Sequence, residues 1–286
     1  MEEKREASHA GSWYSDVPSE LDTQLTTWIE QARVTEVGAK AIIAPHAGYS
    51  YSGPTAAWSY VHIDPNKYSK VFLLGPSHHF YLSGCALPYS SIYNTPLGDI
   101  PVDQSIINSL RSTGLFKSLN KSQELAEHSL ELHLPYIRKV FHQKPITLIP
   151  ILVGHLENED DFGMIFSEHF KNPENLFIIS SDFCHWGRRF SFTPYDASCG
   201  EIWESIQKMD EEGMNIIETQ DLSSFKSYLS RTKNTICGRN PIILLLSTIK
   251  CSNQSFHTKF VKYEQSSKVR GQSESSVSYA AGLTIC

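Results

Sequence analysis

Residues 176–185 read LFIISSDFCH, an apolar run that ends in polar residues. The run 176–180 is short, apolar and rich in β-branched residues, which predicts a buried strand. Asp182 and His185 follow it in a turn. Parallel sheets place their active sites at this end, because the loops after the strands splay open into a crevice. The stretch therefore predicts an α/β protein with a polar site at the strand ends.

Four more runs have the same apolar character and alternate with helical patterns. The predicted strands are 41–44, 71–74, 147–153 and 278–285, and the predicted helices are 19–32, 103–110, 196–209 and one that Asn240 and Pro241 open. Residues 252–276 resemble a loop with an edge strand. This alternation predicts a largely parallel sheet flanked by helices. Because no repeat or linker divides residues 1–286, we expect a single α/β domain.

Composition excludes several classes of protein. The formal net charge is −6, and no basic cluster is longer than Arg188-Arg189, so we expect no nucleic-acid binding. No run approaches the ~18 apolar residues that suggest a membrane span, and the charged first residues lack the apolar segment of a secretion signal. The six cysteines are irregularly spaced, which is typical of reduced intracellular thiols.

Two histidines follow predicted strands at matched positions. His46 follows residues 41–44 and His78 follows residues 71–74, a separation of about one βαβ unit of roughly thirty residues. Adjacent parallel strands would bring both imidazoles to the same edge of the sheet. Imidazole binds zinc, copper, iron and nickel well. The pair therefore predicts a metal site, with His79 replacing His78 if the strand ends one residue later.

Cys237 is the candidate for a third ligand. Arg239 and the helix start just downstream both favour thiolate over thiol, which would make the sulfur a better ligand and a better nucleophile. The alternative is a small buried apolar residue, the common fate of an intracellular cysteine. The sequence alone favours neither the ligand interpretation nor the buried-residue interpretation of Cys237.

Other polar residues have two interpretations each. Asp182 and His185 stand where a general acid or base and its orienting carboxylate are often found, with Trp186 as a wall, or they form a turn in which Asp182 caps a backbone amide. Glu127 and His128 belong to a helix-like stretch, and His128 lines the pocket or lies on a solvated helix face.

Taken together, several segments resemble the Memo family, the mediators of ErbB2-driven cell motility. The resemblance runs from Arg5 to the last predicted strand. The segments that carry it are REASHAGSWY (5–14), APHAGY (44–49), LGPSHH (74–79), EHS (127–129), LPY (134–136), SSDFCHW (180–186) and TICGR (235–239).

The resemblance implies a fold similar to class III non-haem-iron extradiol dioxygenases. In those enzymes two histidines and a carboxylate hold Fe(II), and a further histidine acts as acid and base. By motif, His46 and His78 match the metal histidines, and His185, with Asp182 beside it, matches the catalytic histidine. Cys237 stands where the dioxygenase pattern has a carboxylate. A thiolate there would favour copper(I) or zinc over an oxygen-rich Fe(II) centre.

The resemblance also implies a cytoplasmic effector, with a nuclear location open as well, that links receptor tyrosine kinase signals to motility, the cytoskeleton and reactive oxygen production. Its implied partners are phosphorylated receptor or adaptor peptides and Rho-type GTPases or other cytoskeletal regulators. We expect the pocket to be lined by His79, Glu127, His128, Trp13, Tyr49 and Trp186.

Three functions follow, and the first is a copper or iron redox centre. The second is a phosphopeptide-binding scaffold without catalysis, in which Arg188 and Arg189 supply positive charge. The third, ranked last because of Cys237, is a metal-dependent dioxygenase.

Overall fold

The computed structural model describes residues 3–142 and 144–286. Helices and strands alternate along most of this chain, which confirms the predicted α/β class. The strands are β1 (Lys4–Arg5), β2 (Ala41–Ala44), β3 (Lys70–Pro76), β4 (Cys85–Leu87), β5 (Ile92–Tyr93), β6 (Ile100–Pro101), β7 (Lys117–Ser118), β8 (Thr147–Val153), β9 (Asn175–Ser180), β10 (His185–Gly187), β11 (His257–Gln265) and β12 (Ser275–Ile285). The helices are α1 (Pro18–Gln31), α2 (Tyr49–Tyr60), α3 (Gln104–Ser112), α4 (Lys121–Ala126), α5 (His128–Glu131), α6 (Leu134–Phe141), α7 (Glu159–Lys171), α8 (Ile202–Glu218), α9 (Leu222–Thr232) and α10 (Arg239–Ser252), with short 3-10 helices at Arg188–Phe190 and Ala197–Cys199.

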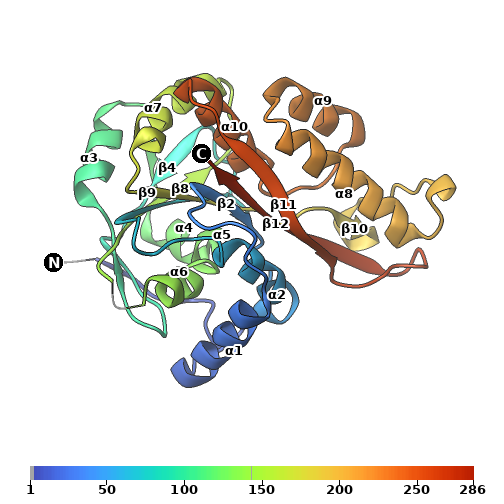
Figure 1. The fold of residues 1–286 in the computed structure, drawn as a ribbon, viewed down its shortest axis with the longest axis horizontal. Helices are drawn as coiled ribbons and strands as arrows, with labels where there is room; N and C mark the ends of the chain where they lie inside the picture. Colours follow the sequence, from blue (N-terminus) through green and yellow to red (C-terminus); the bar gives the residue numbers. More distant parts are fainter. Residues whose placement is uncertain (1–2, 143) are drawn as a thin grey trace.

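One large sheet forms the centre of the molecule (Figure 1). Its strand order is β10-β12-β2-β9-β3-β8-β4-β7, and β11 pairs with β12. The four central strands, β2, β9, β3 and β8, run parallel, whereas β12 and β4 pair antiparallel on either side of them. The central strands are apolar because helices cover both faces of the sheet. The predicted parallel sheet is therefore confirmed for these four strands.

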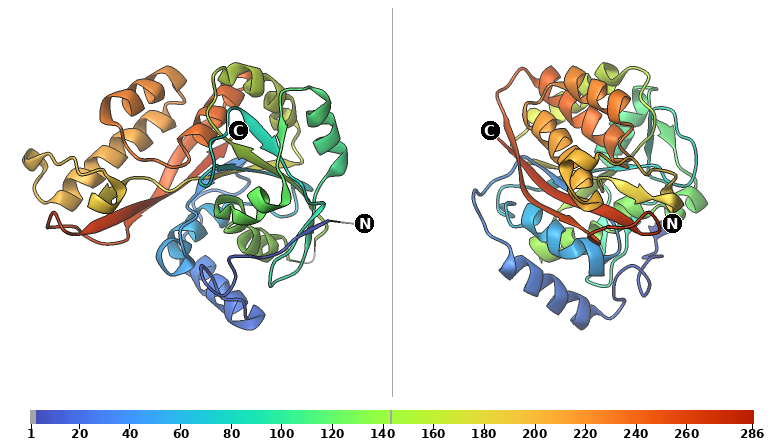
Figure 2. Two further views of the ribbon diagram at one scale, coloured as in Figure 1. Left: turned by 180° about the vertical axis from the view of Figure 1, so that it is seen from behind. Right: turned by 90° about the vertical axis from the view of Figure 1, so that its right-hand side faces the viewer.

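Helices pack on both faces of the sheet. Helices α7 and α10 lie side by side on one face, and α1, α2 and α6 lie on the other (Figures 1 and 2). A smaller sheet of β1, β5 and β6 holds the start of the chain. Within the described residues, no helix has both the length and the apolar character needed to cross a membrane.

The region after β10 differs from the prediction. The helix predicted over residues 196–209 begins only at Ile202 and continues to Glu218. Asp196 instead caps a 3-10 helix that ends at Cys199, and the φ of 97° at the next residue, Gly200, prevents a continuous α-helix. Glu201 then starts α8 with a capping box. The expected edge strand within 252–276 is β11, which forms a long hairpin with β12 beside α8 (Figure 2).

Candidate metal site

The two strand-end histidines lie together at the carboxyl edge of the sheet. His46 follows β2, His78 follows β3, and their ring centroids are 5.1 Å apart. The two strands are not adjacent, contrary to the expectation, because β9 lies between them. The end of β9 therefore contributes its own polar residues, including Asp182, to the space between the two imidazoles.

Cys237 reaches this edge from the loop between α9 and α10. Its Sγ lies 3.2 Å from His46 Nε2 and accepts a hydrogen bond from the Asp182 amide, also at 3.2 Å. The loop approaches β9 closely at Gly238, where a Cβ atom would lie 2.4 Å from the carbonyl oxygen of Ser180. Only glycine fits there, so Gly238 lets Cys237 approach His46.

Among the described residues, two groups of side chains could hold a metal ion, and His46 belongs to both. In each group the candidate ligand atoms lie within 4.8 Å of one another, the first group being His46, His78 and His128 and the second His46, Asp182 and Cys237. The predicted ligands His78 and Cys237 thus fall into different groups. A single ion bound by His46, His78 and Cys237 would require the last two side chains to move toward a common centre.

Glu127 fixes the orientation of His78. Its carboxylate accepts hydrogen bonds from the His78 amide at 2.7 Å and from His78 Nδ1 at 2.8 Å, and it also caps α5 at the Ser129 amide. Burial opposes ionisation of Glu127, but the bonds from His78 and Ser129 outweigh it and lower the carboxyl pKa to about 2. The charged Glu127 leaves the lone pair of His78 on Nε2, as in the carboxylate–histidine pairs of metal sites.

Ser180, at the end of β9, orients His46 in a similar way. Its hydroxyl lies 2.6 Å from His46 Nδ1 and 2.8 Å from His133 Nε2, and it donates to the Ser129 carbonyl at 2.7 Å. The single hydroxyl proton of Ser180 goes to the Ser129 carbonyl. The hydrogen-bond network therefore assigns a proton to His46 Nδ1 and another to His133 Nε2, and each donates to the hydroxyl oxygen. The lone pair of His46 is therefore on Nε2, the atom that faces Cys237.

Burial sets the ionisation of the cluster. It lowers the pKa of His46 well below its usual value and that of His128 to about 3, with the neighbouring His78 adding to both effects. Both rings are therefore neutral near pH 7, as metal binding requires. Burial also raises the pKa of Asp182 against the opposing effects of His185 and the His46 amide.

Cys237 is a thiol in this arrangement, which agrees with the buried-residue alternative of the two that the sequence left open. Burial raises its pKa well above the usual value, and the Asp182 carboxyl adds to that effect. The backbone amides and Arg239 act in the opposite direction but more weakly. Binding a cation would reverse the balance, because a coordinating thiol loses its proton to the metal.

The predicted catalytic residues both lie at this edge. Asp182 is 3% exposed, and its Oδ1 accepts a hydrogen bond from the His46 amide at 2.8 Å. His185 is bound through Nδ1 to the Phe183 carbonyl at 2.9 Å, and its amide donates to Thr235 Oγ1 at 2.7 Å. Within the described hydrogen bonds, His185 has no direct bond to Asp182, so this carboxylate is held by the His46 backbone and does not orient the His185 ring.

The residues expected to line the pocket divide into two sets. In the first set, the His128 ring stacks on the His78 ring, with centroids 4.4 Å apart. The Trp13 ring also lies 4.4 Å from the His128 ring, centroid to centroid, and the exposed His79 ring makes an edge contact with His128 at 5.9 Å between centroids. Tyr49 packs instead among aromatic rings beneath the site and donates to the Leu132 carbonyl. Trp186 is fully buried in a second apolar cluster and donates to the Pro194 carbonyl.

A carboxylate that the sequence did not single out ties the start of the chain to the site. Glu131 is fully buried and accepts hydrogen bonds from Arg5, His9 and Tyr14 at 2.7 to 2.8 Å. These contacts hold the segment that carries Trp13 against His128. From the sequence, Glu131 could be described only as a glutamate four residues after Glu127. Because the chain breaks between α4 and α5, the two carboxylates bind different partners in the structure.

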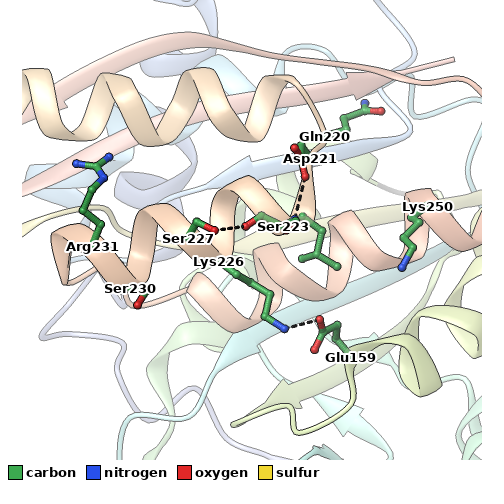
Figure 3. Close-up of a pocket in the computed structure, with 10 residues that line it drawn as sticks. Glu159, Gln220, Asp221, Ser223, Lys226, Ser227, Ser230, Arg231 and Lys250 are labelled. Atoms are coloured by element: carbon green, nitrogen blue, oxygen red, sulfur yellow. Dashed lines mark hydrogen bonds and ion pairs between the residues drawn. The ribbon is translucent and has the colours of Figure 1, made fainter.

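Two cavities differ in their relation to this cluster. A cavity of about 310 Å³ adjoins Cys237 and is lined by the ends of β3 and β8 together with Tyr81, His155, Arg239 and Asn240. A larger one of about 790 Å³ lies where α9, α10 and the start of α7 meet, and its lining includes none of the clustered histidines (Figure 3). There Lys226 pairs with Glu159 at 2.6 Å, and no metal-capable group of the described residues lies in this lining.

Comparison with known proteins identifies the family of this chain. A family profile described as Memo-like protein matches residues 5–283. Protein MEMO1 of Xenopus laevis and Protein MEMO1 of Homo sapiens are each 49% identical over 98% of this chain and 97% of their own length. Protein memo-1 homolog of Caenorhabditis elegans is 48% identical over 99% of this chain and 83% of its own length. The chain therefore belongs to the Memo family.

Proposed function

We propose that this protein binds a redox-active ion, copper or iron, through His46, His78 and Cys237. The observation that carries the proposal is the convergence of three distant segments on His46, whose Nε2 lies 3.2 Å from Cys237 Sγ and whose ring lies 5.1 Å from that of His78. Imidazole with thiolate favours copper(I) or zinc, whereas imidazole with the Asp182 carboxylate suits Fe(II). The ion would supply one-electron chemistry with oxygen.

Hydrogen bonds around the cluster support this proposal. Glu127 and Ser180 leave the Nε2 lone pairs of His78 and His46 available, which is the arrangement that supporting residues impose in metal sites. Asp182, which belongs to a metal-capable group with His46 and Cys237, is a carboxyl group that could hold or move a proton at the site. The cavity of about 310 Å³ at Cys237 offers room for a small molecule.

Metal content tests this proposal directly. The chain is purified without oxygen, and bound metals are measured by elemental mass spectrometry for wild type, His46→Ala and Cys237→Ser. His257→Ala and Cys251→Ser are the controls, because neither residue belongs to the metal-capable groups and His257 is exposed on β11. We expect stoichiometric copper or iron in wild type and controls and its loss in the two site variants. Metal retained by Cys237→Ser, or absent from wild type after reconstitution, contradicts the proposal.

We further infer from family membership a role in signalling, in which the metal centre couples receptor tyrosine kinase signals to motility and reactive oxygen production. The inferred partners are phosphorylated peptides and Rho-type GTPases or other cytoskeletal regulators. A dioxygenase-type oxidation is the remaining candidate, disfavoured because Cys237 stands in place of a carboxylate ligand.

A second candidate function, recognition of a phosphorylated peptide, is favoured by Arg188 and Arg189. Both are exposed on the 3-10 helix after β10, and the next residue, Phe190, contacts the His185 ring with centroids 5.2 Å apart. Guanidinium groups at the edge of a site suit a phosphate. We expect Arg188→Ala to weaken binding of a labelled phosphotyrosine peptide, measured by fluorescence anisotropy, with metal content unchanged and with Arg111→Ala as the control. Equal affinities for Arg188→Ala and wild type argue against this function.

A further inference from the structure

Four aromatic rings contact one another in sequence beneath the metal-capable cluster; we name this series the stack after its inner pair, because the outer contacts are tilted or edge-on. Tyr60 lies on Tyr136 with centroids 4.6 Å apart and ring planes 15° from parallel. Tyr136 is 5.6 Å from Tyr49, which is 6.1 Å from Trp28. The three tyrosines are buried, whereas Trp28 is only partly buried. The stack therefore runs from the interior, through α2 and α6, to the surface helix α1.

Hydrogen bonds join the inner end of this stack to the cluster. The Tyr60 hydroxyl lies 2.8 Å from His133 Nδ1, and His133 Nε2 lies 2.8 Å from Ser180 Oγ. Ser180 Oγ lies 2.6 Å from His46 Nδ1. Since His133 gives its Nε2 proton to Ser180, its Nδ1 carries a lone pair and Tyr60 is the donor. A continuous path of hydrogen bonds thus runs from Tyr60 to a candidate metal ligand.

Tyr60 differs from the other tyrosines of the stack in its hydrogen-bond partner. The hydroxyls of Tyr136 and Tyr49 each donate to a backbone carbonyl, of Gly53 and Leu132 respectively, at 2.6 Å. A phenol that loses an electron becomes a strong acid and must lose its proton at the same time. The His133 imidazole, even with its pKa lowered to about 3 by burial, is a much stronger base than an amide carbonyl and can accept that proton. Tyr60 is therefore the member of the stack best arranged for reversible oxidation.

We propose that Tyr60 is a redox-active residue that donates an electron to the metal centre while His133 takes up its proton. This proposal rests on the redox function proposed above. With hydrogen peroxide as oxidant, copper(I) gives one electron and Tyr60 gives the other. Two protons from solvent complete the reduction of peroxide to two waters. The phenolic proton moves to His133 Nδ1, leaving copper(II), a neutral Tyr60 radical and a protonated His133.

The surroundings of His133 make this oxidation transient. Burial lowers the pKa of the His133 imidazole to about 3. The protonated ring therefore returns its proton to Tyr60 as soon as an electron arrives. A one-electron reductant in solution, such as ascorbate, supplies the returning electron at the partly buried Trp28 and releases its own proton to solvent. The electron reaches Tyr60 across the rings of Tyr49 and Tyr136 without oxidation of their phenols. Tyr60 thus acts as a relay and not as a stable radical site.

Such a relay would protect the ligands themselves. An oxidant formed at the cluster lies next to Cys237, whose sulfur would otherwise be oxidised to sulfinic or sulfonic acid. Supplying an electron from Tyr60 removes the oxidant before it attacks the thiol. Loss of Tyr60 should therefore shift damage onto Cys237.

The test uses the full chain loaded with copper(I) without oxygen. Bound copper is measured first, hydrogen peroxide is added, and frozen samples are examined by electron paramagnetic resonance, with Cys237 oxidation measured by peptide mass spectrometry. Wild type should show a tyrosyl radical, and Tyr60→Phe should lose most of it and oxidise Cys237 more. The control is Tyr228→Phe, since Tyr228 is equally buried, donates to the Met209 carbonyl and lies outside the stack.

The outcomes separate this proposal from the metal proposal. An unchanged radical in copper-loaded Tyr60→Phe overturns the relay and leaves metal binding intact. Absence of bound copper in wild type overturns metal binding by copper, and the relay with it. If Tyr60→Phe does not fold, His133→Phe takes its place, because it keeps an aromatic ring and removes the proton acceptor. The same loss of radical is then expected, and an undiminished radical overturns the relay.

Discussion

Two aspartates, Asp182 at the end of β9 and Asp210 in α8, are buried almost completely, at 3% and 0% exposure. Burial raises the carboxyl pKa of both. Asp210 accepts hydrogen bonds from Asn234 at 2.8 Å and Tyr263 at 2.9 Å, so neutral donors surround it. Asp182 instead lies beside His46 and Cys237, which offer a lone pair and a thiol.

The two aspartates differ in whether the groups around them can still bind a ligand. Around Asp210 the donors are directed at the carboxylate itself, and the group needs no further ligand. Around Asp182 the lone pair of His46 Nε2 and the sulfur of Cys237 face a common space. Burial and a raised pKa therefore do not identify a functional carboxylate unless the neighbouring groups retain binding capacity.

The larger expected effect concerns Asp210 and pH. Its pKa is about 6, raised by burial from 3.8, so the folded chain holds this proton more tightly than the unfolded chain. The unfolded state then binds fewer protons between about pH 4 and 6, and the free energy of unfolding falls as pH rises through this window. A shift of about two pKa units corresponds to roughly 3 kcal/mol.

Asp210→Asn should remove this pH dependence while keeping the side chain's shape. The measurement is urea unfolding of wild type and variant at several pH values, because the difference between the two chains cancels the other titrating groups. Wild type should lose stability relative to Asp210→Asn as pH rises from about 4 to 6. A constant difference across this range would show that Asp210 ionises normally and would remove the basis of the comparison with Asp182.

Apolar runs made the central strands predictable. Strands β2 and β8 coincide with the predicted residues, and β3 and β9 differ only at their ends, because strands covered on both faces are apolar throughout. Their order in the sheet was not predictable. Strand β9 enters between β2 and β3 from more than ninety residues after β3, and no local pattern records that pairing.

The same holds for the site: residues marked by a local sequence pattern were predictable, whereas roles that depend on contacts between distant segments were not. His46 and His78 stand at strand ends, where residue type and position both indicate a ligand. Ser180 does not stand out, because a serine at the end of a strand is ordinary and its contact with His133 joins residues 47 positions apart. The sequence could not decide between thiol and thiolate at Cys237, since burial and the Asp182 carboxyl, which outweigh Arg239, depend on packing.

The smaller expected effect concerns Ser180, which contacts the imidazole next to Asp182. Ser180→Ala removes the shared hydrogen-bond acceptor of His46 and His133, so the His46 ring loses its fixed orientation. Loss of such a supporting residue typically lowers metal affinity by about 10-fold to 100-fold. Competition with a copper(I) chelator measures this change, and we expect a value near the lower end, about 10-fold, because the Asp182 carboxylate still holds the His46 backbone amide at 2.8 Å.

Ser59→Ala is the matched control for this effect. Ser59 is also fully buried and donates to the Ile43 carbonyl at 2.7 Å, but it does not contact the imidazoles of the cluster. Each substitution should cost about 1 kcal/mol of stability through the lost hydrogen bond. Only Ser180→Ala should also weaken metal binding. Equal metal affinities in the two variants would mean that the His46 ring is held by packing alone, and that the lone pair facing Cys237 does not depend on the hydrogen bonds of β9.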